Sequence, residues 1–173
     1  MNSGRRKQGE TGRSKAGRGM RFGIVVSRFH GGITKRLQQG AERYLVRHGV
    51  RREDVQVYSC PGAFELPQVA NLLCEVGEFD AIICLGAVIR GETPHFEYVS
   101  SEAARGIQHV AIHHTRPVAF GVLTTDTLEQ ANARAGGSAG NKGLDAAQAA
   151  LEMAILFRKL KRKIGRTSLH PER

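Results

Sequence analysis

The sequence of 173 residues contains no tryptophan, only 6% aromatic residues and three cysteines. No stretch approaches the roughly 18 apolar residues that a membrane-spanning helix needs, so we expect no membrane contact. The basic N-terminus is not followed by an apolar segment, which argues against a secretory signal. The cysteines are odd in number and too widely spaced for a paired-cysteine metal knuckle, which favours buried thiols in a reducing compartment. We therefore expect a cytoplasmic protein.

Acidic residues are scarce at both ends of the chain. The whole sequence has 26 basic and 16 acidic residues, whereas residues 1–21 hold seven basic and one acidic, and residues 158–173 hold the same numbers. Residues 1–20 have little to bury, so we expect a disordered basic extension there, a single domain over 21–163, and a flexible basic tail over 164–173. Such ends favour weak contact with polyanions as an accessory property, although no nucleic-acid motif accompanies them.

Apolar runs and amphipathic segments alternate four times between these ends. The alternation predicts a flavodoxin-like three-layer α/β/α sandwich around a four-stranded parallel sheet. Ligands bind such sheets outside the carboxyl ends of the strands, which directs attention to the loops that follow the strands. The predicted strands are 22–27, 55–60, 81–86 and 118–123; the predicted helices are 33–49, 65–76, 95–113, 128–135 and 144–161; the loops of interest are 28–32, 61–65, 87–95 and 124–127.

The loop at 86–95 follows the most apolar predicted strand and opens a helix. Its free amides and the positive helix end suit an anion such as phosphate. The lysine of a nucleotide-binding P-loop is missing, and no dinucleotide fingerprint follows any strand. An ordinary strand-to-helix turn explains the spacing equally well.

Three further residue sets could carry chemistry. His95 opens the helix after this loop and could transfer protons near neutral pH, although a surface histidine is the commoner case. His109 and His113 are spaced to chelate a metal, but no third ligand lies near them in the sequence. Cys60 ends a predicted strand without the pattern of a nucleophile elbow, so structural burial is favoured.

Aromatic and basic residues also occur on the predicted crevice loops. Phe29 and Phe64 could stack on a planar ligand or pack locally against loop neighbours. Arg134 and Lys142 flank the glycine-rich segment 136–143 and could bind an anionic substrate, although a solvated charged loop is commoner. If they serve the crevice, they approach from far along the chain or from a neighbouring subunit.

Five motifs follow one another along the chain: Ser-Arg-Phe-His at 27–30, Pro-Gly-Ala-Phe-Glu-Leu-Pro at 61–67, Gly-Ala-Val-Ile-Arg-Gly-Glu-Thr-Pro-His-Phe-Glu-Tyr at 86–98, Gly-Val-Leu-Thr-Thr-Asp-Thr-Leu-Glu-Gln-Ala at 121–131, and Gly-Asn-Lys-Gly at 140–143. In this order they resemble the lumazine synthase family, and the resemblance covers about 22–160. It implies an enzyme that condenses 5-amino-6-(D-ribitylamino)uracil with 3,4-dihydroxy-2-butanone 4-phosphate, without metal or redox cofactor. A lumazine-synthase-like body that binds ligand without catalysis is the alternative.

The resemblance also implies a role for each matching residue. His95 would transfer protons, and Phe29 would stack on the pyrimidine ring. The remaining roles are as follows: Ala63, Phe64 and Glu65 line the uracil and ribityl side; Ala87, Val88 and Ile89 offer backbone groups to the ring; Glu92 and Thr93 hold the phosphate; Phe120, Arg134 and Lys142 reach in from the adjacent subunit, with Arg134 on the phosphate.

A shared site implies a homo-oligomer. The family resembled here forms pentamers, some of which build sixty-subunit icosahedral shells, and the short segment 136–143 lacks the insertion typical of pentamer-only members. The resemblance further suggests association with riboflavin synthase. One residue departs from the family pattern: His30 stands where asparagine is common.

Overall fold

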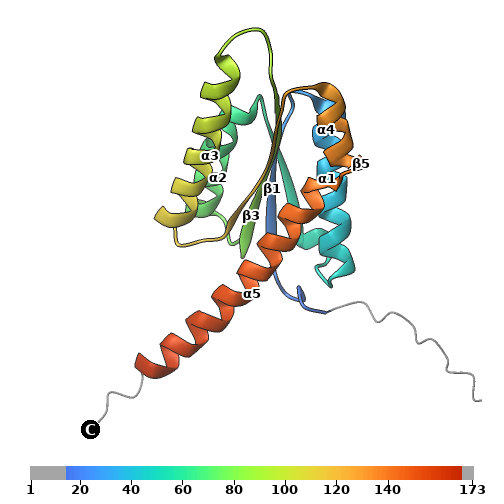
Figure 1. Ribbon diagram of the computed structural model, residues 1–173. Helices are drawn as coiled ribbons and strands as arrows, with labels where there is room; N and C mark the ends of the chain where they lie inside the picture. Colours follow the sequence, from blue (N-terminus) through green and yellow to red (C-terminus); the bar gives the residue numbers. More distant parts are fainter. Residues whose placement is uncertain (1–14, 169–173) are drawn as a thin grey trace, which may run out of the picture.

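A computed structural model describes residues 15–168 (Figure 1). Residues 1–14 of the basic extension expected over 1–20, and residues 169–173 of the expected tail, lie outside this range. The strands β1 (Phe22–Ser27), β2 (Val55–Cys60), β3 (Ala81–Ile89) and β4 (Val118–Thr125) form one parallel sheet in the order β2-β1-β3-β4. The expected four-stranded parallel sheet is therefore confirmed.

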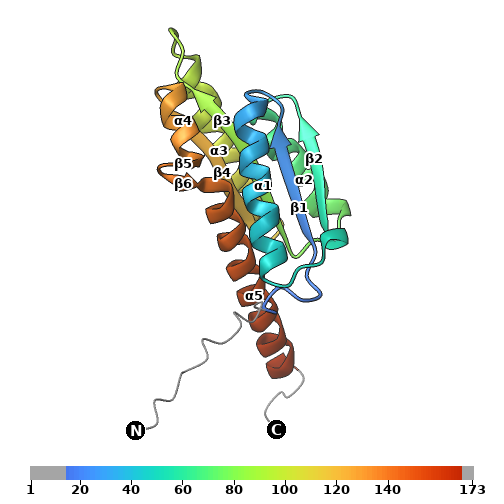
Figure 2. The same cartoon turned by 90° about the vertical axis from the view of Figure 1, so that its right-hand side faces the viewer.

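Helices cover both faces of this sheet, as the two views show (Figures 1 and 2). The helices α1 (Gly31–Arg47) and α5 (Lys142–Ser168) pack on one face, and α2 (Leu66–Val76) and α3 (His95–His113) pack on the other. The short elements are η1 (Arg52–Asp54), η2 (Ala63–Glu65), α4 (Leu128–Arg134), β5 (Ala135–Gly137) and β6 (Gly140–Asn141). The expected α/β/α layering is confirmed.

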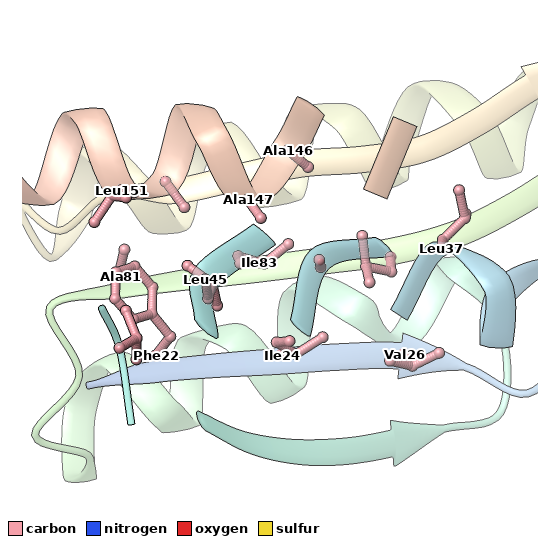
Figure 3. Packing of buried hydrophobic residues seen from close by; sticks show 14 of the residues in the cluster. Phe22, Ile24, Val26, Leu37, Leu45, Ala81, Ile83, Ala146, Ala147 and Leu151 are labelled. Atoms are coloured by element: carbon pink, nitrogen blue, oxygen red, sulfur yellow. The ribbon is translucent and has the colours of Figure 1, made fainter. Parts of the chain in front are cut away.

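The core explains why β1 is apolar along its whole length. Phe22, Ile24 and Val26 point to the layer of α1 and α5 (Figure 3), while Val25 joins the cluster beneath α2 and α3. Both faces of the strand are thus buried, which is why its side chains do not alternate between apolar and polar. Small residues of α5 are buried in the same cluster as α1 and keep the helix close to the sheet; they are Ala146, Ala147 and Ala150.

The third strand is longer than its apolar run suggested. Residues 87–89 were expected in a loop, but they pair in register with Leu123, Thr124 and Thr125 of β4. The backbone of 87–89 is therefore held in the sheet, because the neighbouring strand continues beside it. This extension carries three of the expected site residues on a rigid element.

The segment 136–143 differs from the expected glycine-rich loop. It forms the small antiparallel ribbon of β5 and β6, in which Gly136 and Gly140 adopt positive φ angles of 106° and 77°. Asn141 then starts α5, because its side-chain oxygen accepts hydrogen bonds from the amides of Gly143 (2.9 Å) and Leu144 (3.1 Å).

Both ends of the described chain are more structured than the sequence suggested. Residues 16–19 form a turn, Gly17 N donates to the carbonyl of His48 at 2.8 Å, and Met20 is buried in the core. At the other end, α5 runs to Ser168, past the expected end at 161 and past the expected domain boundary at 163. Within residues 15–168, no helix combines the length and apolar composition that a bilayer crossing requires.

Candidate active site

A cavity of about 550 Å³ opens at the carboxyl ends of β1, β2 and β3. This is the edge where a parallel sheet of this kind binds ligands. Three chain segments form its walls: the turn after β1, the turn after β2, and the end of β3 with the start of α3. The expected site residues among its lining are Phe29, Ala63, Phe64, Glu65, Ala87, Val88, Ile89, Thr93 and His95.

The turn after β1 presents an aromatic ring to the cavity. The Phe29 side chain is 66% exposed, and its ring meets the His30 ring edge-on at 4.6 Å between centroids. His30 has φ 56° and ψ 45°, a left-handed conformation in which histidine and asparagine are both enriched. The amides of Arg28 and Phe29 donate to the carbonyls of Cys60 and Pro61, so this turn is fixed to the turn after β2.

The turn after β2 is held by its own glutamate. The Glu65 carboxylate accepts a hydrogen bond from the amide of Gly62 at 2.8 Å, which closes the turn around Ala63 and Phe64. Ala63 is buried, whereas the Phe64 ring is half-exposed at the cavity wall. An apolar surface beside a fixed carboxylate can bind the ring and the polar side chain of one ligand.

The third wall combines strand backbone with a helix start. Ala87 and Val88 are buried and Ile89 is partly buried, while Thr93 and His95 are exposed at the mouth. Pro94 precedes α3, and no side chain caps the helix. The first amides of α3 are therefore available to an anion at the positive end of the helix.

Arg90 fixes the loop that leads to this helix start. Its Nε donates to the Asp126 carboxylate and its Nη1 to the Glu97 carboxylate, both at 2.7 Å. Its guanidinium lies 4.3 Å from the centroid of the Phe96 ring, and its amide donates to Thr125 O at 2.9 Å. The two carboxylates raise the pKa of Arg90, so this arginine keeps its charge.

Four expected site residues lie outside the cavity. Glu92 is exposed on the loop between two lining residues. Phe120, 45% exposed, lies on the edge strand β4. Arg134 donates to the carbonyl of Gln130 at 3.1 Å, and Lys142 pairs with Asp145 at 2.7 Å. Within one chain, these last three residues do not complete the cavity.

Sequence reasoning missed several lining residues. Phe96, Tyr98 and Val99 of α3 contribute to the wall, as do Gly62 and Gly91. The positions of Tyr98 and Val99 relative to His95 follow from the helical repeat, because residues three or four apart share one face of a helix. That spacing was present in the sequence and could have identified the α3 residues.

The cysteines and the paired histidines considered from the sequence are not suited to catalysis or metal binding. Cys60 is buried; burial raises the pKa of its thiol to about 11, and its Sγ donates to the Gly62 carbonyl at 3.3 Å. Burial also raises the pKa of Cys74 and Cys84. Cys60 therefore lacks the thiolate character of a nucleophile. The rings of His109 and His113 stack at 5.8 Å, and no described residues form a cluster of three metal-ligating side chains.

A second hollow, of about 370 Å³, lies between α3, β4 and α5. Its walls include Ile112, Val118 and Met153, and its only ionisable side chain is that of Arg116. This surface lacks convergent polar groups, so the cavity at the carboxyl edge is the better candidate for chemistry.

Comparison with known proteins identifies the family of this chain. A family model described as 6,7-dimethyl-8-ribityllumazine synthase matches residues 19–158. The chain belongs to this family. A 6,7-dimethyl-8-ribityllumazine synthase of Syntrophus aciditrophicus (strain SB) is 57% identical over 143 residues, which cover 83% of this chain and 93% of that protein.

The resemblance to lumazine synthases read from five motifs is therefore confirmed. Lumazine synthases are transferases of riboflavin biosynthesis that act on small molecules and oligomerise. The matched residues include all four strands of the sheet and every wall of the cavity. The match ends at residue 158, within α5, which continues to Ser168.

Proposed function

We propose that this cavity condenses 5-amino-6-(D-ribitylamino)uracil with 3,4-dihydroxy-2-butanone 4-phosphate to give 6,7-dimethyl-8-ribityllumazine, phosphate and water. The observation that carries the proposal is the convergence of His95, the uncapped start of α3 and the exposed Phe29 ring on one cavity. A proton carrier, an anion site and a stacking surface are the groups that this reaction needs.

The pyrimidine occupies the apolar side of the cavity. Phe29 stacks on the ring, and Ala63, Phe64 and Glu65 line the uracil and ribityl side. Backbone groups of β3 at Ala87, Val88 and Ile89 meet the edge of the ring, and their pairing with β4 supports this role because it keeps them in place. A rigid wall lowers the entropic cost of holding the ring in one orientation.

The four-carbon phosphate occupies the mouth of the cavity. Its phosphate accepts hydrogen bonds at the start of α3, beside Thr93 and Glu92, where the helix end favours negative charge. Imine formation, phosphate elimination and ring closure all move protons, and His95 is the residue placed to carry them. Positioning supplies the larger share of the rate, and the histidine adds about 10²–10⁴-fold.

Phe120, Arg134 and Lys142 complete the site of an adjacent subunit, with Arg134 on the phosphate. All three lie away from the cavity of their own chain, with Phe120 of β4 and Lys142 of α5 exposed and Arg134 of α4 partly exposed, which supports this assignment. The apolar hollow along β4 supports a subunit interface on the same edge. The assembly is a pentamer, and the short β5–β6 ribbon is compatible with a sixty-subunit shell.

Mixing two impaired variants tests both the activity and the sharing of sites. His95→Ala should lower kcat, and Arg134→Ala should raise KM for the phosphate substrate, with lumazine absorbance as the measurement. Co-expressed in equal amounts with different tags, the two variants should recover about a quarter of wild-type sites in mixed oligomers, because a symmetric ring pairs each cavity with one neighbour. An Arg134 variant with full activity contradicts the phosphate assignment, and activity that does not recover on mixing contradicts the shared site.

Native mass measurement tests the assembly separately. A species near sixty copies supports the shell, whereas a single pentameric species rejects it.

Association with riboflavin synthase and a cytoplasmic location also belong to this proposal, and copurification of the synthase from the native host tests the association. A protein that binds the pyrimidine but forms no lumazine would be a binding module instead of an enzyme.

A further inference from the structure

The net charge of this chain lies entirely outside the segment that matches the family. Residues 19–158 contain 14 basic and 14 acidic residues. Residues 1–18 and 159–173 each contain six basic residues and one acidic residue, and together they account for the net charge of +10. A neutral body therefore carries two basic segments that the family match does not include.

The structure brings together Gly19 and Arg158, the two residues of the body from which these segments extend. Arg158 donates through Nη2 to the carbonyl of Gly19 at 2.6 Å, and it pairs with Asp80 through Nε and Nη2 at 2.7 and 2.8 Å. The amide of Arg21 donates to the same Asp80 carboxylate at 2.8 Å. Both views show α5 leaving the body beside the segment that precedes β1, at the end of the sheet opposite the loop before α3 (Figures 1 and 2).

The described part of this surface is exposed and carries one sign of charge. We define the basic end by six exposed residues: Lys15, Arg18, Lys159, Lys161, Arg162 and Lys163. The last four lie on little more than one turn of α5, so about 6 Å of helix axis carries four cations. The sequence contains no acidic residue between 159 and 168.

A small polar hollow lies at the base of α5, beside the basic end. Its volume is about 80 Å³, and Arg116, Arg158 and Lys161 contribute to its wall together with Asp80. Arg116 is held by hydrogen bonds from Nη1 to the carbonyls of Gly77 (2.9 Å) and Phe79 (2.6 Å). Three cations around one carboxylate leave this hollow with excess positive charge.

We propose that the basic end binds single-stranded nucleic acid through its phosphate backbone, without sequence preference. Phosphate chains match a dense row of lysines and arginines because binding releases their condensed counterions. Residues 159–173 contain no aromatic residue, so they can contact the phosphates of a strand but offer no ring on which its bases could stack, and for this reason we expect no sequence preference. They also lack the aromatic side chains that anchor a basic helix in a membrane interface. The surface is far from the cavity, so this binding is independent of the proposed catalysis.

A charge-matched pair of variants tests the proposal in the full chain. The first variant combines Lys159→Gln, Lys161→Gln and Arg162→Gln. The control combines Lys35→Gln, Arg43→Gln and Arg47→Gln, three exposed cations of α1, and so has the same net charge. Fluorescence anisotropy of a labelled oligouridylate, measured over a series of salt concentrations, gives Kd and its salt dependence for both variants and the wild type.

We expect the α5 variant to bind about tenfold more weakly than the wild type, with a salt slope smaller by about 2, because each contact to a single strand contributes about 0.7. The control should stay within about twofold of the wild type, and lumazine formation should be unchanged in both. Equal weakening in the two variants would overturn the proposal in favour of a net-charge effect. Wild-type binding to phosphatidylserine vesicles but not to the oligouridylate would overturn it in favour of a membrane surface.

Discussion

The two ends of the parallel sheet differ in shape, charge and chemistry. At the carboxyl end, the chain forms a concave cavity with aromatic walls and a few fixed polar groups. At the amino end, α5 projects with four cations on little more than one turn. The net charge of +10 comes entirely from residues outside 19–158, whereas every residue that lines the cavity of the first end lies within 19–158. Total charge is therefore a poor guide to the chemistry of this chain, whereas the position of each charge is informative.

One helix connects the two ends. The first half of α5 is anchored by buried residues, among them Ala147, Leu151 and Ala154, whereas Leu160 and Ile164 further along are exposed. The buried half belongs to the core that positions the cavity, and the exposed half belongs to the basic end. Substitutions made in only one of these halves therefore test whether the two ends of the sheet work independently.

The largest expected effect is a loss of activity at the carboxyl end of the sheet that leaves binding at the amino end unchanged. His95→Ala should lower kcat by about 10²-fold or more without abolishing turnover, because positioning of both substrates remains. Its binding of the oligouridylate should equal that of the wild type. Steady-state kinetics and anisotropy on the same preparation provide both measurements. Unchanged kcat would remove His95 from the mechanism.

Substituting alanine for either of two glycines of α5 should change stability in opposite directions. A Cβ at Gly143 would collide with the backbone of Leu37, so Gly143→Ala should lower the free energy of unfolding by about 2 kcal/mol or more. A Cβ at Gly165 meets no atom within 4 Å, so Gly165→Ala should raise helix stability by about 0.5–1 kcal/mol. Urea unfolding measures the first effect, and far-ultraviolet circular dichroism on heating measures the second. A destabilising Gly143→Ala with normal cavity kinetics at low temperature would show that the cavity tolerates loosening of this helix.

Arg90 should influence the carboxyl end through charge compensation. Arg90→Gln leaves the carboxylates of Glu97 and Asp126 unpaired beside the loop of the proposed phosphate site. We expect KM for the phosphate substrate to rise a few-fold, because the two carboxylates left without their cation would repel the phosphate, while solvent screens these exposed charges and keeps the effect modest. KM for the pyrimidine should change little, Arg90→Lys should be intermediate, and adding Asp126→Asn to Arg90→Gln should recover affinity. Equal changes in both KM values would indicate a general loss of structure instead.

The smallest expected effect concerns His30. Asparagine also adopts the left-handed conformation found at this position, so His30→Asn should keep the turn and the contact to Phe29 largely intact. We expect a pH–rate profile that superimposes on that of the wild type. A displaced profile would instead assign His30 a part in proton transfer within the cavity.

The sequence predicted the sheet well because each strand is a short apolar run with both faces covered. The bounds of β1 and β2 agree with the predicted 22–27 and 55–60. The end of β3 was missed, since residues 87–89 are strand only through their pairing with β4. The ribbon of β5 and β6 was missed for a similar reason, because two and three residues carry no periodic pattern.

The candidate site was partly predictable. Motif order identified the three segments that form the cavity, and the structure brings Phe29, Phe64 and His95 together. It leaves Phe120, Arg134 and Lys142 elsewhere, because these residues follow the edge strand β4 or lie on it. A single chain therefore accounts for one side of the site and leaves the other side to the proposed neighbouring subunit.

By itself, the sequence determined the strand and helix types, the family resemblance and the placement of the basic residues at the two ends, because periodicity, motifs and charge are local properties. Only the tertiary structure decided which segments meet. The contact of Arg158 with Gly19 and Asp80 joins residues far apart in the chain, and the packing of the parallel strands brings three separate turns to one cavity. Such proximity depends on the order of the strands in the sheet, which no local pattern encodes.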